Sequence, residues 1–417
     1  MKARLSIMVA LVLVMSIMMT NCAPAGTTTP EVTETAVYPP APEFIQIGSS
    51  IPLAGKYGGL GKQVLAGYQY AVEDINAAGG VFVEEYNTSI PLNFEYYDDE
   101  SDATKTNTNL EQLYAEYDVV AYLGGAGSDV HAAGAAIAEK NKVPYLGISF
   151  AWYNIHLRGY DYLFSPFVKS PAQARDLFLF FDEMVPQDPK PNIAIFQEDT
   201  DYGIEINSMF EATAKGKGYP VVYYGTYAPR TTDYSSLIQG AMAAQAEILL
   251  GSVSGPDGMA IMRGLAELNW TPKFTLLIRG PDEITWGENL GTLGDYVAFF
   301  PSWHYSEDFP GVEELNAKHQ AEFGRPADVL VGPAYACVQI LADAITRAGT
   351  LDREAVRDAI SATDMTTVIG PVTFNLDGTG NVLNPLEMWL NGQQEVIWPL
   401  DMQTADFVYP APAFDQR

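Results

Sequence analysis

The sequence has little of the two residue types that most often carry covalent or metal chemistry: it contains only two cysteines and four histidines. Cys22 ends an N-terminal export signal, described below, so the chain after it holds one thiol, Cys337, and no intrachain disulfide is possible. Cys337 falls within an apolar helical pattern, which favours a core residue over a catalytic thiol. The histidines lack the spacing of zinc ligands; they are His131, His156, His304 and His319.

Positive charge is also scarce. The chain has 23 Lys and Arg against 52 Asp and Glu, which gives a formal net charge of −29. Such a field repels nucleic acid and anionic lipid headgroups, and this argues against both as partners. Acidity by itself gives no information about a ligand.

Several catalytic and cofactor motifs are absent. Gly61-Lys62 is followed by Gln63, so it does not match a P-loop, and no GxGxxG or GxSxG sequence occurs. The acidic residues 98–102 lack the twelve-residue calcium loop with its glycine, and a solvated turn is the favoured interpretation. Nucleotide, calcium and serine-hydrolase sites are therefore disfavoured, and no cofactor or metal is expected.

The N-terminus has the features of an export signal. Lys2 and Arg4 precede an apolar stretch of 15 residues, 5–19, which is short for a membrane span of about 20 residues. It ends in Thr20-Asn21-Cys22, which is similar to a bacterial lipobox, although Asn21 departs from the usual small residue. We expect a signal peptide over 1–21, acylation of Cys22, and a Thr/Pro/Ala-rich flexible tether over 22–42. A plain secretion signal or an uncleaved anchor is the alternative, and each of them places the protein outside the cytoplasm.

The rest of the chain exceeds one hydrophobic core and predicts two lobes. Short β-type runs alternate with amphipathic helical patterns from residue 47 to 149. The same alternation of strands and helices begins again near 162–166 and continues to 278. This alternation is typical of an α/β fold with doubly wound parallel sheets.

The stretch 46–81, QIGSSIPLAGKYGGLGKQVLAGYQYAVEDINAAGGV, contains a strand, a glycine loop and a helix in that order. It resembles the opening of the type I periplasmic solute-binding proteins, specifically the branched-chain amino acid (leucine/isoleucine/valine) binding family of ABC importers. The resemblance implies two Rossmann-like lobes joined by a three-segment hinge, crossed near residues 165, 299 and 371. It predicts lobe 1 over 43–165 plus 300–371 and lobe 2 over 166–299 plus 372–417.

The resemblance also implies ligand-binding residues on the first lobe. Ser128 follows a strand end, where its hydroxyl and backbone N–H would bind the α-carboxylate of the ligand; an ordinary N-cap is the alternative. Ala151, Trp152 and Tyr153 align with a second ligand segment. Two aromatic residues replace the small residues usual there, so they would either line the pocket, stack on a ring or cation, or pack between the lobes.

On the second lobe, Tyr202 matches a family tyrosine that closes over the ligand. Asp282 aligns with the acidic residue whose carboxylate pairs with the ligand's ammonium group, and the adjacent Glu283 could serve instead. Arg279 could neutralise both acids as a surface pair. Leu60 and residues 251–254 stand where the family has further ligand tyrosines, so a reshaped pocket is expected.

The sequence thus predicts a non-enzymatic solute-binding protein of an ABC importer, held at the membrane by a lipid anchor. It would capture an amino acid or a related small polar solute between two lobes and deliver it to the permease. We expect it to act as a monomer. A ligand-binding sensor for amino acids or amides is the alternative within binding proteins. A secreted α/β hydrolase is the alternative of another class, and the missing nucleophile motif disfavours it.

Overall fold

The computed structural model describes residues 37–283 and 285–417. The predicted signal peptide, Cys22 and most of the predicted tether lie outside the described residues. The end of the tether, residues 37–42, is exposed and has no helix or strand.

The first lobe is built on a five-stranded parallel sheet of order β4-β1-β5-β6-β7. Strand β1, which lies between β4 and β5, carries an almost continuous run of buried residues, as expected for a parallel strand that is covered on both faces. The strands are β1 Ile45–Ile51, β4 Leu92–Asp98, β5 Ala121–Leu123, β6 Tyr145–Leu146 and β7 Leu163–Phe164.

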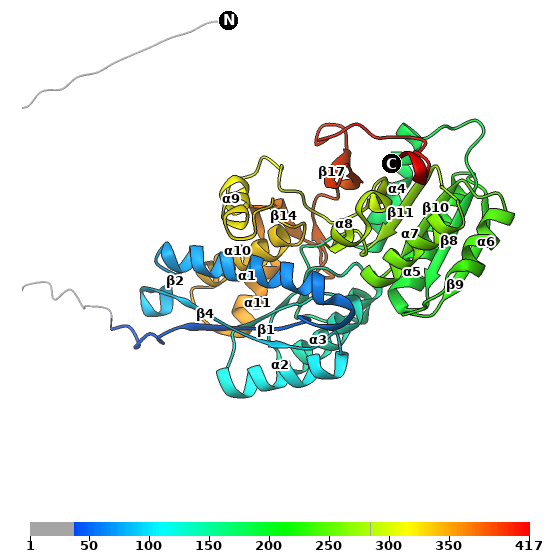
Figure 1. Cartoon of the computed structure of the whole chain (residues 1–417). Helices are drawn as coiled ribbons and strands as arrows, with labels where there is room; N and C mark the ends of the chain where they lie inside the picture. Colours follow the sequence, from blue (N-terminus) through cyan, green and yellow to red (C-terminus); the bar gives the residue numbers. More distant parts are fainter. Residues whose placement is uncertain (1–36, 284) are drawn as a thin grey trace, which may run out of the picture. The chain divides into compact units, whose positions relative to one another are not determined.

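Helices from two distant parts of the chain cover this sheet. In Figure 1 the blue helix α1 lies beside the orange helix α10, and the two are in such close contact that a Cβ added at Gly67 would lie 2.4 Å from the carbonyl oxygen of Val331. The late segment therefore returns to the first lobe, as predicted. The helices are α1 Gly58–Ala77, α2 Ala103–Tyr117, α3 Ser128–Asn141, α9 Val312–Phe323, α10 Val331–Ala348 and α11 Arg353–Ser361.

The second lobe contains a seven-stranded sheet of order β17-β16-β12-β11-β10-β8-β9. The strands from β8 to β12 are parallel, and at one edge β16 pairs antiparallel with both β12 and β17. The strands are β8 Ile193–Glu198, β9 Val221–Tyr227, β10 Ile248–Ser252, β11 Phe274–Ile278, β12 Val297–Phe299, β16 Leu386–Leu390 and β17 Gln393–Trp398. The helices are α4 Ser170–Met184, α5 Asp201–Gly216, α6 Ser235–Ala243, α7 Gly255–Glu267 and α8 Thr285–Leu290.

The chain passes between the two sheets three times: after β7, after β12 and before β16. Two parallel-sheet lobes joined in this way confirm the predicted fold class. A small sheet of β13 Asp364–Thr367, β14 Gly370–Phe374 and β15 Gly380–Asn381 precedes the third passage. A bridge between Ser165 and Thr379 holds it beside β7. The lobe limits given above stay a prediction. The hairpin of β2 Val81–Val83 and β3 Thr88–Ile90 was not foreseen.

Of the glycines expected in the loop after β1, Gly58, Gly59 and Gly61 instead lie in the first turn of α1, and Gly55 begins a short 3₁₀ helix, Gly55–Tyr57, before it. The physical reason is a close approach of backbones: a Cβ added at Gly61 would lie 1.8 Å from the carbonyl oxygen of Pro52. These glycines therefore bring the helix onto the end of β1, and no phosphate loop is formed.

The acidic turn after β4 is more than a solvated turn. Asp99 is buried and accepts a hydrogen bond from the Ser50 hydroxyl at 3.0 Å. Asp98 accepts one from the backbone N–H of Leu53 at 2.9 Å. The turn after β4 is thereby tied to the loop after β1, which leads to the candidate site.

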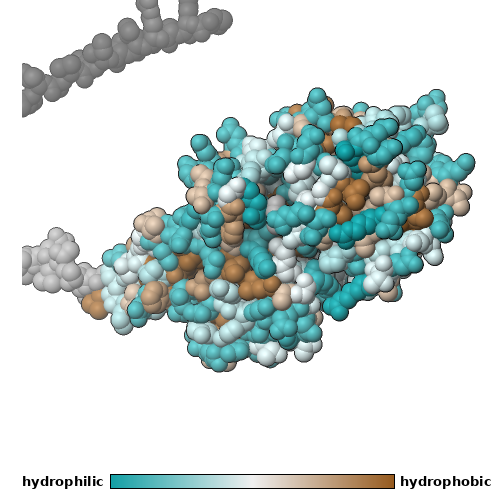
Figure 2. Space-filling model, viewed as in Figure 1, coloured by the Kyte–Doolittle hydropathy of each residue, from teal (hydrophilic) through white to brown (hydrophobic). Residues whose placement is uncertain are grey.

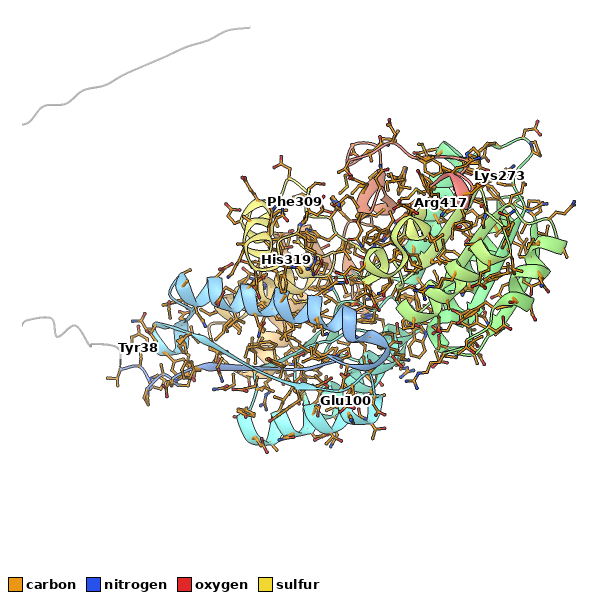
Figure 3. All side chains as sticks on the ribbon, in the orientation of Figure 1. Tyr38, Glu100, Lys273, Phe309, His319 and Arg417 are labelled. Atoms are coloured by element: carbon orange, nitrogen blue, oxygen red, sulfur yellow. The ribbon has the colours of Figure 1, made fainter. Side chains whose placement is uncertain are left out.

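The end of the chain packs on the second lobe, where Figure 3 places Arg417 near Lys273. Ala411 donates its backbone N–H to the Lys273 carbonyl at 3.0 Å, and Arg417 donates to the Asp295 carbonyl at 2.8 Å. The face shown in Figure 2 is mostly hydrophilic, with hydrophobic patches interrupted by polar residues. None of the described helices combines the length and apolar composition that crossing a bilayer requires.

Candidate functional site

A small cavity of about 60 Å³ lies where the carboxyl ends of strands from both sheets meet. Ligands of open α/β sheets bind at this edge, so we take it as the candidate site. Half of its lining comes from the first lobe and half from the second. The lining residues are Tyr57, Ser128, Asp129, Trp152, Thr200, Asp201, Tyr202 and Arg279.

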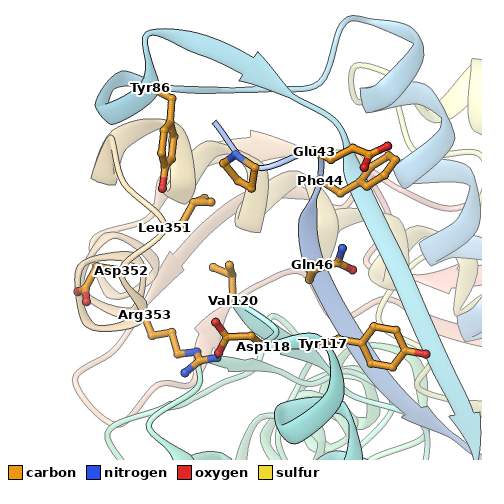
Figure 4. A pocket seen from close by; sticks show the side chains of 11 residues that line it. Glu43, Phe44, Gln46, Tyr86, Tyr117, Asp118, Val120, Leu351, Asp352 and Arg353 are labelled. Atoms are coloured by element: carbon orange, nitrogen blue, oxygen red, sulfur yellow. The ribbon is translucent and has the colours of Figure 1, made fainter. Parts of the chain in front are cut away.

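Larger hollows occur elsewhere on the surface, but they lack this position. One of about 610 Å³ lies beside the start of β1 and is lined by residues of the first lobe alone. Figure 4 shows it as a depression between Tyr86, Gln46 and Arg353, without a side chain from the second sheet. Its Arg353 is paired with Asp118 at 2.6 Å. Such a groove does not explain why two lobes face each other.

The first lobe contributes the N-terminus of α3. Gly127 precedes this helix with φ +103°, and a Cβ there would lie 2.2 Å from the Tyr57 ring, so only glycine fits. Ser128 is the first residue of the helix and is buried, and its hydroxyl group makes no hydrogen bond to another described residue. A helix N-terminus with a free hydroxyl can hold an anionic group.

His131 fixes the same helix start. Its Nδ1 donates to the carbonyl oxygen of Gly127 at 2.7 Å. Burial lowers the pKa of His131 to about 3, so the imidazole is neutral at physiological pH and acts as a hydrogen-bonding core residue. Within the described residues, no group of His, Cys, Asp and Glu is arranged to hold a metal ion.

The second lobe contributes the N-terminus of α5. Thr200 caps this helix by accepting the Gly203 backbone N–H at 3.1 Å, and Tyr202 lies in the first turn. The Tyr202 hydroxyl donates to the Gln173 side chain at 3.1 Å. Since its hydroxyl is engaged inside the lobe, Tyr202 offers the cavity its ring. The N-termini of α3 and α5 thus reach one cavity from opposite lobes.

Arg279 is the buried charge among the lining residues. Its guanidinium is paired with Glu198, lies 3.4 Å from the Tyr57 hydroxyl oxygen, and is 5.0 Å from the centroid of the Tyr202 ring. Burial lowers the pKa of Arg279, but Glu198 and the two tyrosines raise it by more, so the group stays charged. Its Nε has no partner among the described residues.

This position corrects the expectation that Arg279 forms a surface pair with Asp282 or Glu283. The physical reason is the backbone at the end of β11, which has φ +80° at Arg279. The side chain turns into the space between the lobes, where Glu198 is the nearest buried acid.

Asp282 is buried but does not line the cavity. Its backbone carbonyl accepts the Gln63 side chain from the first lobe at 2.9 Å, whereas its Oδ1 has no partner. Burial and then the neighbouring Glu283 raise the pKa of Asp282 to about 8. Burial likewise raises the pKa of Glu283 to about 7. In this arrangement neither acid is presented to the cavity as an ammonium partner.

The three side chains of the segment 151–153 lie in three different environments. Trp152 lines the cavity. Ala151 is buried, and its carbonyl accepts the Ser170 backbone N–H at 2.8 Å. Tyr153 begins the short 3₁₀ helix η3, Tyr153–Arg158, and its hydroxyl donates to Asp377 at 3.1 Å, on the side of a separate hollow.

A buried acid of the second lobe also contacts this segment. Glu205 in α5 accepts the backbone N–H groups of Tyr153 at 2.7 Å and Asn154 at 2.9 Å, and it is bonded to the Ser170 hydroxyl. Because the carboxylate of Glu205, in the second lobe, binds backbone groups of the first lobe, it fixes the position of η3 relative to α5. No pattern in the sequence distinguishes it from other helical glutamates.

Of the six ligand-binding residues predicted from the sequence, the structure brings three to the cavity: Ser128, Trp152 and Tyr202. It places Ala151, Tyr153 and Asp282 outside the lining. It adds five residues that the sequence did not single out as ligand-binding residues: Tyr57, Asp129, Thr200, Asp201 and Arg279. Tyr57 lies three residues before Leu60, where a family tyrosine was expected, so the loop after β1 still supplies an aromatic ring. The binding roles of all these residues stay predictions.

Comparison with known proteins identifies the family. The model of the periplasmic binding protein family matches residues 45–388. A Leu/Ile/Val-binding protein homolog 7 from Brucella abortus is 25% identical over 347 residues, covering 78% of this chain and 83% of the relative.

Solved structures share the fold. A leucine binding protein from Thermotoga maritima superposes with a TM-score of 0.76 at 20% identity, over 84% of this chain and 97% of that one. A branched-chain amino acid transporter substrate binding protein from Streptococcus pneumoniae, in complex with isoleucine, gives 0.75 at 19% identity, over 88% and 100%. A solute binding protein from R. palustris, in complex with benzoate, gives 0.71 at 17% identity, over 85% and 95%.

The family match spans most of the chain, the topology agrees, and a cavity lies between the lobes where the fold binds its ligands. The family consists of binding proteins, so the predicted non-enzymatic class is confirmed. The chain belongs to the periplasmic binding protein family.

Proposed function

We propose that this protein is the extracytoplasmic solute-binding component of an ABC importer, and that it captures an amino acid or a related small polar solute between its lobes. The observation that carries the proposal is the cavity lined from both lobes, with the N-termini of α3 and α5 directed to it. The names of the relatives and neighbours, which include leucine-, isoleucine- and benzoate-binding proteins, support a small carboxylate-bearing solute.

The mechanism needs no covalent chemistry. Contacts between the lobes hold them together, among them the Gln63 side chain with the Asp282 carbonyl and Arg279 with Tyr57. A solute that touches Ser128 on one lobe and Tyr202 on the other adds to these contacts only when the lobes are together. It therefore shifts the population toward the closed form by its differential affinity for that form.

The proposed partners follow from this role. The closed surface would be recognised by the membrane-embedded permease, to which the solute is delivered. Acylation of Cys22 would keep the protein at the outer face of the membrane, and we propose that it acts as a monomer.

A thermal-shift screen over amino acids, amides, urea and aromatic acids tests the proposal. A true ligand at a hundredfold excess over its Kd stabilises the protein by about 2.7 kcal/mol. The Ser128→Ala variant should lose most of this stabilisation, whereas Tyr153→Phe, altered on the far side of the segment, should keep it. Stabilisation that is equal in both variants would contradict the proposed site.

Transport is tested in cells. Deleting the protein should abolish uptake of the ligand found in the screen, and restoring it should recover uptake. A deletion strain that keeps full uptake but loses a ligand-induced transcriptional response would favour the sensor alternative.

A further inference from the structure

Each of the aromatic rings that line the cavity already has a positively charged side chain of the protein against it. The Lys56 ammonium group lies 4.6 Å from the centroid of the Tyr57 ring, the Arg158 guanidinium carbon 5.0 Å from Trp152, and that of Arg279 5.0 Å from Tyr202. All three lining aromatics are thus paired with a cation of the protein itself. A ligand ammonium group would therefore find each of these ring faces already occupied by a cation.

The carboxylates near the cavity are already engaged or lie away from it. Asp129 is paired with Lys56 at 2.7 Å, and Glu198 is paired with Arg279. Asp282 and Glu283 lie outside the lining. Asp201 remains, but it is exposed at the first turn of α5. No buried carboxylate among the described lining residues is presented to bind an amine.

Donors for an anion are present in the same space. Arg279 is about nine-tenths buried and lines the cavity; its Nη2 is paired with Glu198, and its Nε has no partner among the described residues. The Ser128 hydroxyl has no hydrogen-bond partner in the part of the chain that the structure describes, and two helix N-termini reach the cavity from opposite sides. A carboxylate would satisfy these donors with charge-assisted hydrogen bonds, which are the strong ones.

Building on the proposed function, we propose that the cavity selects a carboxylate anion without an ammonium group, such as a 2-oxo acid or a simple carboxylic acid, over the zwitterionic amino acid of the same shape. Arg279 is the residue that binds the carboxylate from the second lobe. The three cation–aromatic pairs discriminate against an amine. The charged groups of the solute therefore decide whether it binds, and the shape of the cavity decides which side chain the solute can have.

Matched pairs of solutes test this inference by calorimetry and thermal shift: alanine with pyruvate, leucine with 4-methyl-2-oxopentanoate, and phenylalanine with phenylpyruvate. In the pair that fits, the oxo acid should bind at least about tenfold more tightly than the amino acid, a difference of about 1.4 kcal/mol. Tighter binding of the amino acid would overturn the inference and leave the proposed function intact. If neither these solutes nor the wider screen bind, both fail.

Variants identify the groups responsible. Arg279→Gln alone would leave Glu198 buried and unpaired, so the double variant Arg279→Gln/Glu198→Gln is the safer test. It should lose at least tenfold in oxo-acid affinity and most of the preference over the amino acid. Arg158→Gln should lower the preference about two- to fivefold. Arg263→Gln, on the outside of the second lobe, is the control and should change neither.

A further variant tests the one acid left. Asp201→Asn should leave the affinity for an amino acid no lower than in the unchanged protein. If it abolishes amino acid binding, Asp201 is an ammonium partner and the inference is wrong.

Discussion

Replacing Gly59 with alanine should weaken ligand binding without lowering the stability of the unliganded protein. Gly59 lies in the first turn of α1 on the first lobe, and Glu283 follows β11 on the second. A Cβ at Gly59 would lie 2.6 Å from Oε2 of Glu283, well inside the 3.4 Å at which ordinary van der Waals contact begins. The new methyl group therefore opposes the contact between the lobes.

The glutamate has little room to yield. On its other side, a Cβ at Gly255 in α7 would lie 2.6 Å from the same carboxyl group, so the carboxyl group is held between the two glycines. Overpacking of this kind costs about 1–3 kcal/mol. Since the cost applies only when the lobes are together, it appears as a loss of ligand affinity of about 5- to 150-fold.

The same substitution favours the helix. Alanine in place of glycine in a helix adds about 0.5–1 kcal/mol where it fits. Urea unfolding of the unliganded Gly59→Ala protein should therefore show equal or higher stability, while calorimetry shows a higher Kd. Small-angle scattering without ligand should give a larger radius of gyration, since the lobes separate more often.

Gly255→Ala is the matched control. Its methyl group meets the same carboxyl group, but both residues belong to the second lobe, so the cost falls on open and closed forms alike. Stability should fall and Kd should change little. An unchanged Kd and radius of gyration in Gly59→Ala would refute the reasoning, because they would show that Glu283 moves aside freely.

Three further predictions concern single buried groups. Burial raises the pKa of Glu307 to about 8, so its contribution to stability is fully present below about pH 4.5 and is lost as the pH rises through 8. Urea unfolding at pH 5 and pH 8 should therefore show a smaller fall in stability for Glu307→Gln than for the unchanged protein. An equal fall would show that Glu307 is not the group responsible. Cys337 is fully buried, and burial raises its thiol pKa, so in a Cys22→Ala chain a thiol reagent should label it only after unfolding; rapid labelling of the native protein would disprove this. Tyr202→Phe removes the hydrogen bond to Gln173 and should cost about 0.5–1.5 kcal/mol of stability with little change in affinity, whereas Tyr202→Ala should lose at least tenfold in affinity; a similar affinity loss in both would place the hydroxyl in the ligand's shell.

Half of the predicted ligand-binding residues line the cavity, because their placement depends on the local order of strand and helix. Ser128 follows β5 and Tyr202 follows β8, and parallel strands bring their carboxyl ends to one edge of each sheet. The predicted residues that lie outside the cavity do so because of the directions in which their side chains point. Tyr153 is one residue beyond Trp152, yet its hydroxyl reaches Asp377 near β15 while Trp152 faces the cavity. Alignment alone does not fix which way neighbouring side chains turn.

The sequence by itself determined the α/β class and the two series of strands and helices, because these follow from the period of the apolar residues and from the parallel connection of the strands. The resemblance to the family implied the return of α10 to the first lobe, and the order of the strands indicated the edge of each sheet where we propose that a ligand binds. Only the tertiary structure decided which charges meet. Arg279 pairs with Glu198, 81 residues away, and not with the acids beside it in sequence, because a buried charge takes the partner that the packed backbones bring within reach.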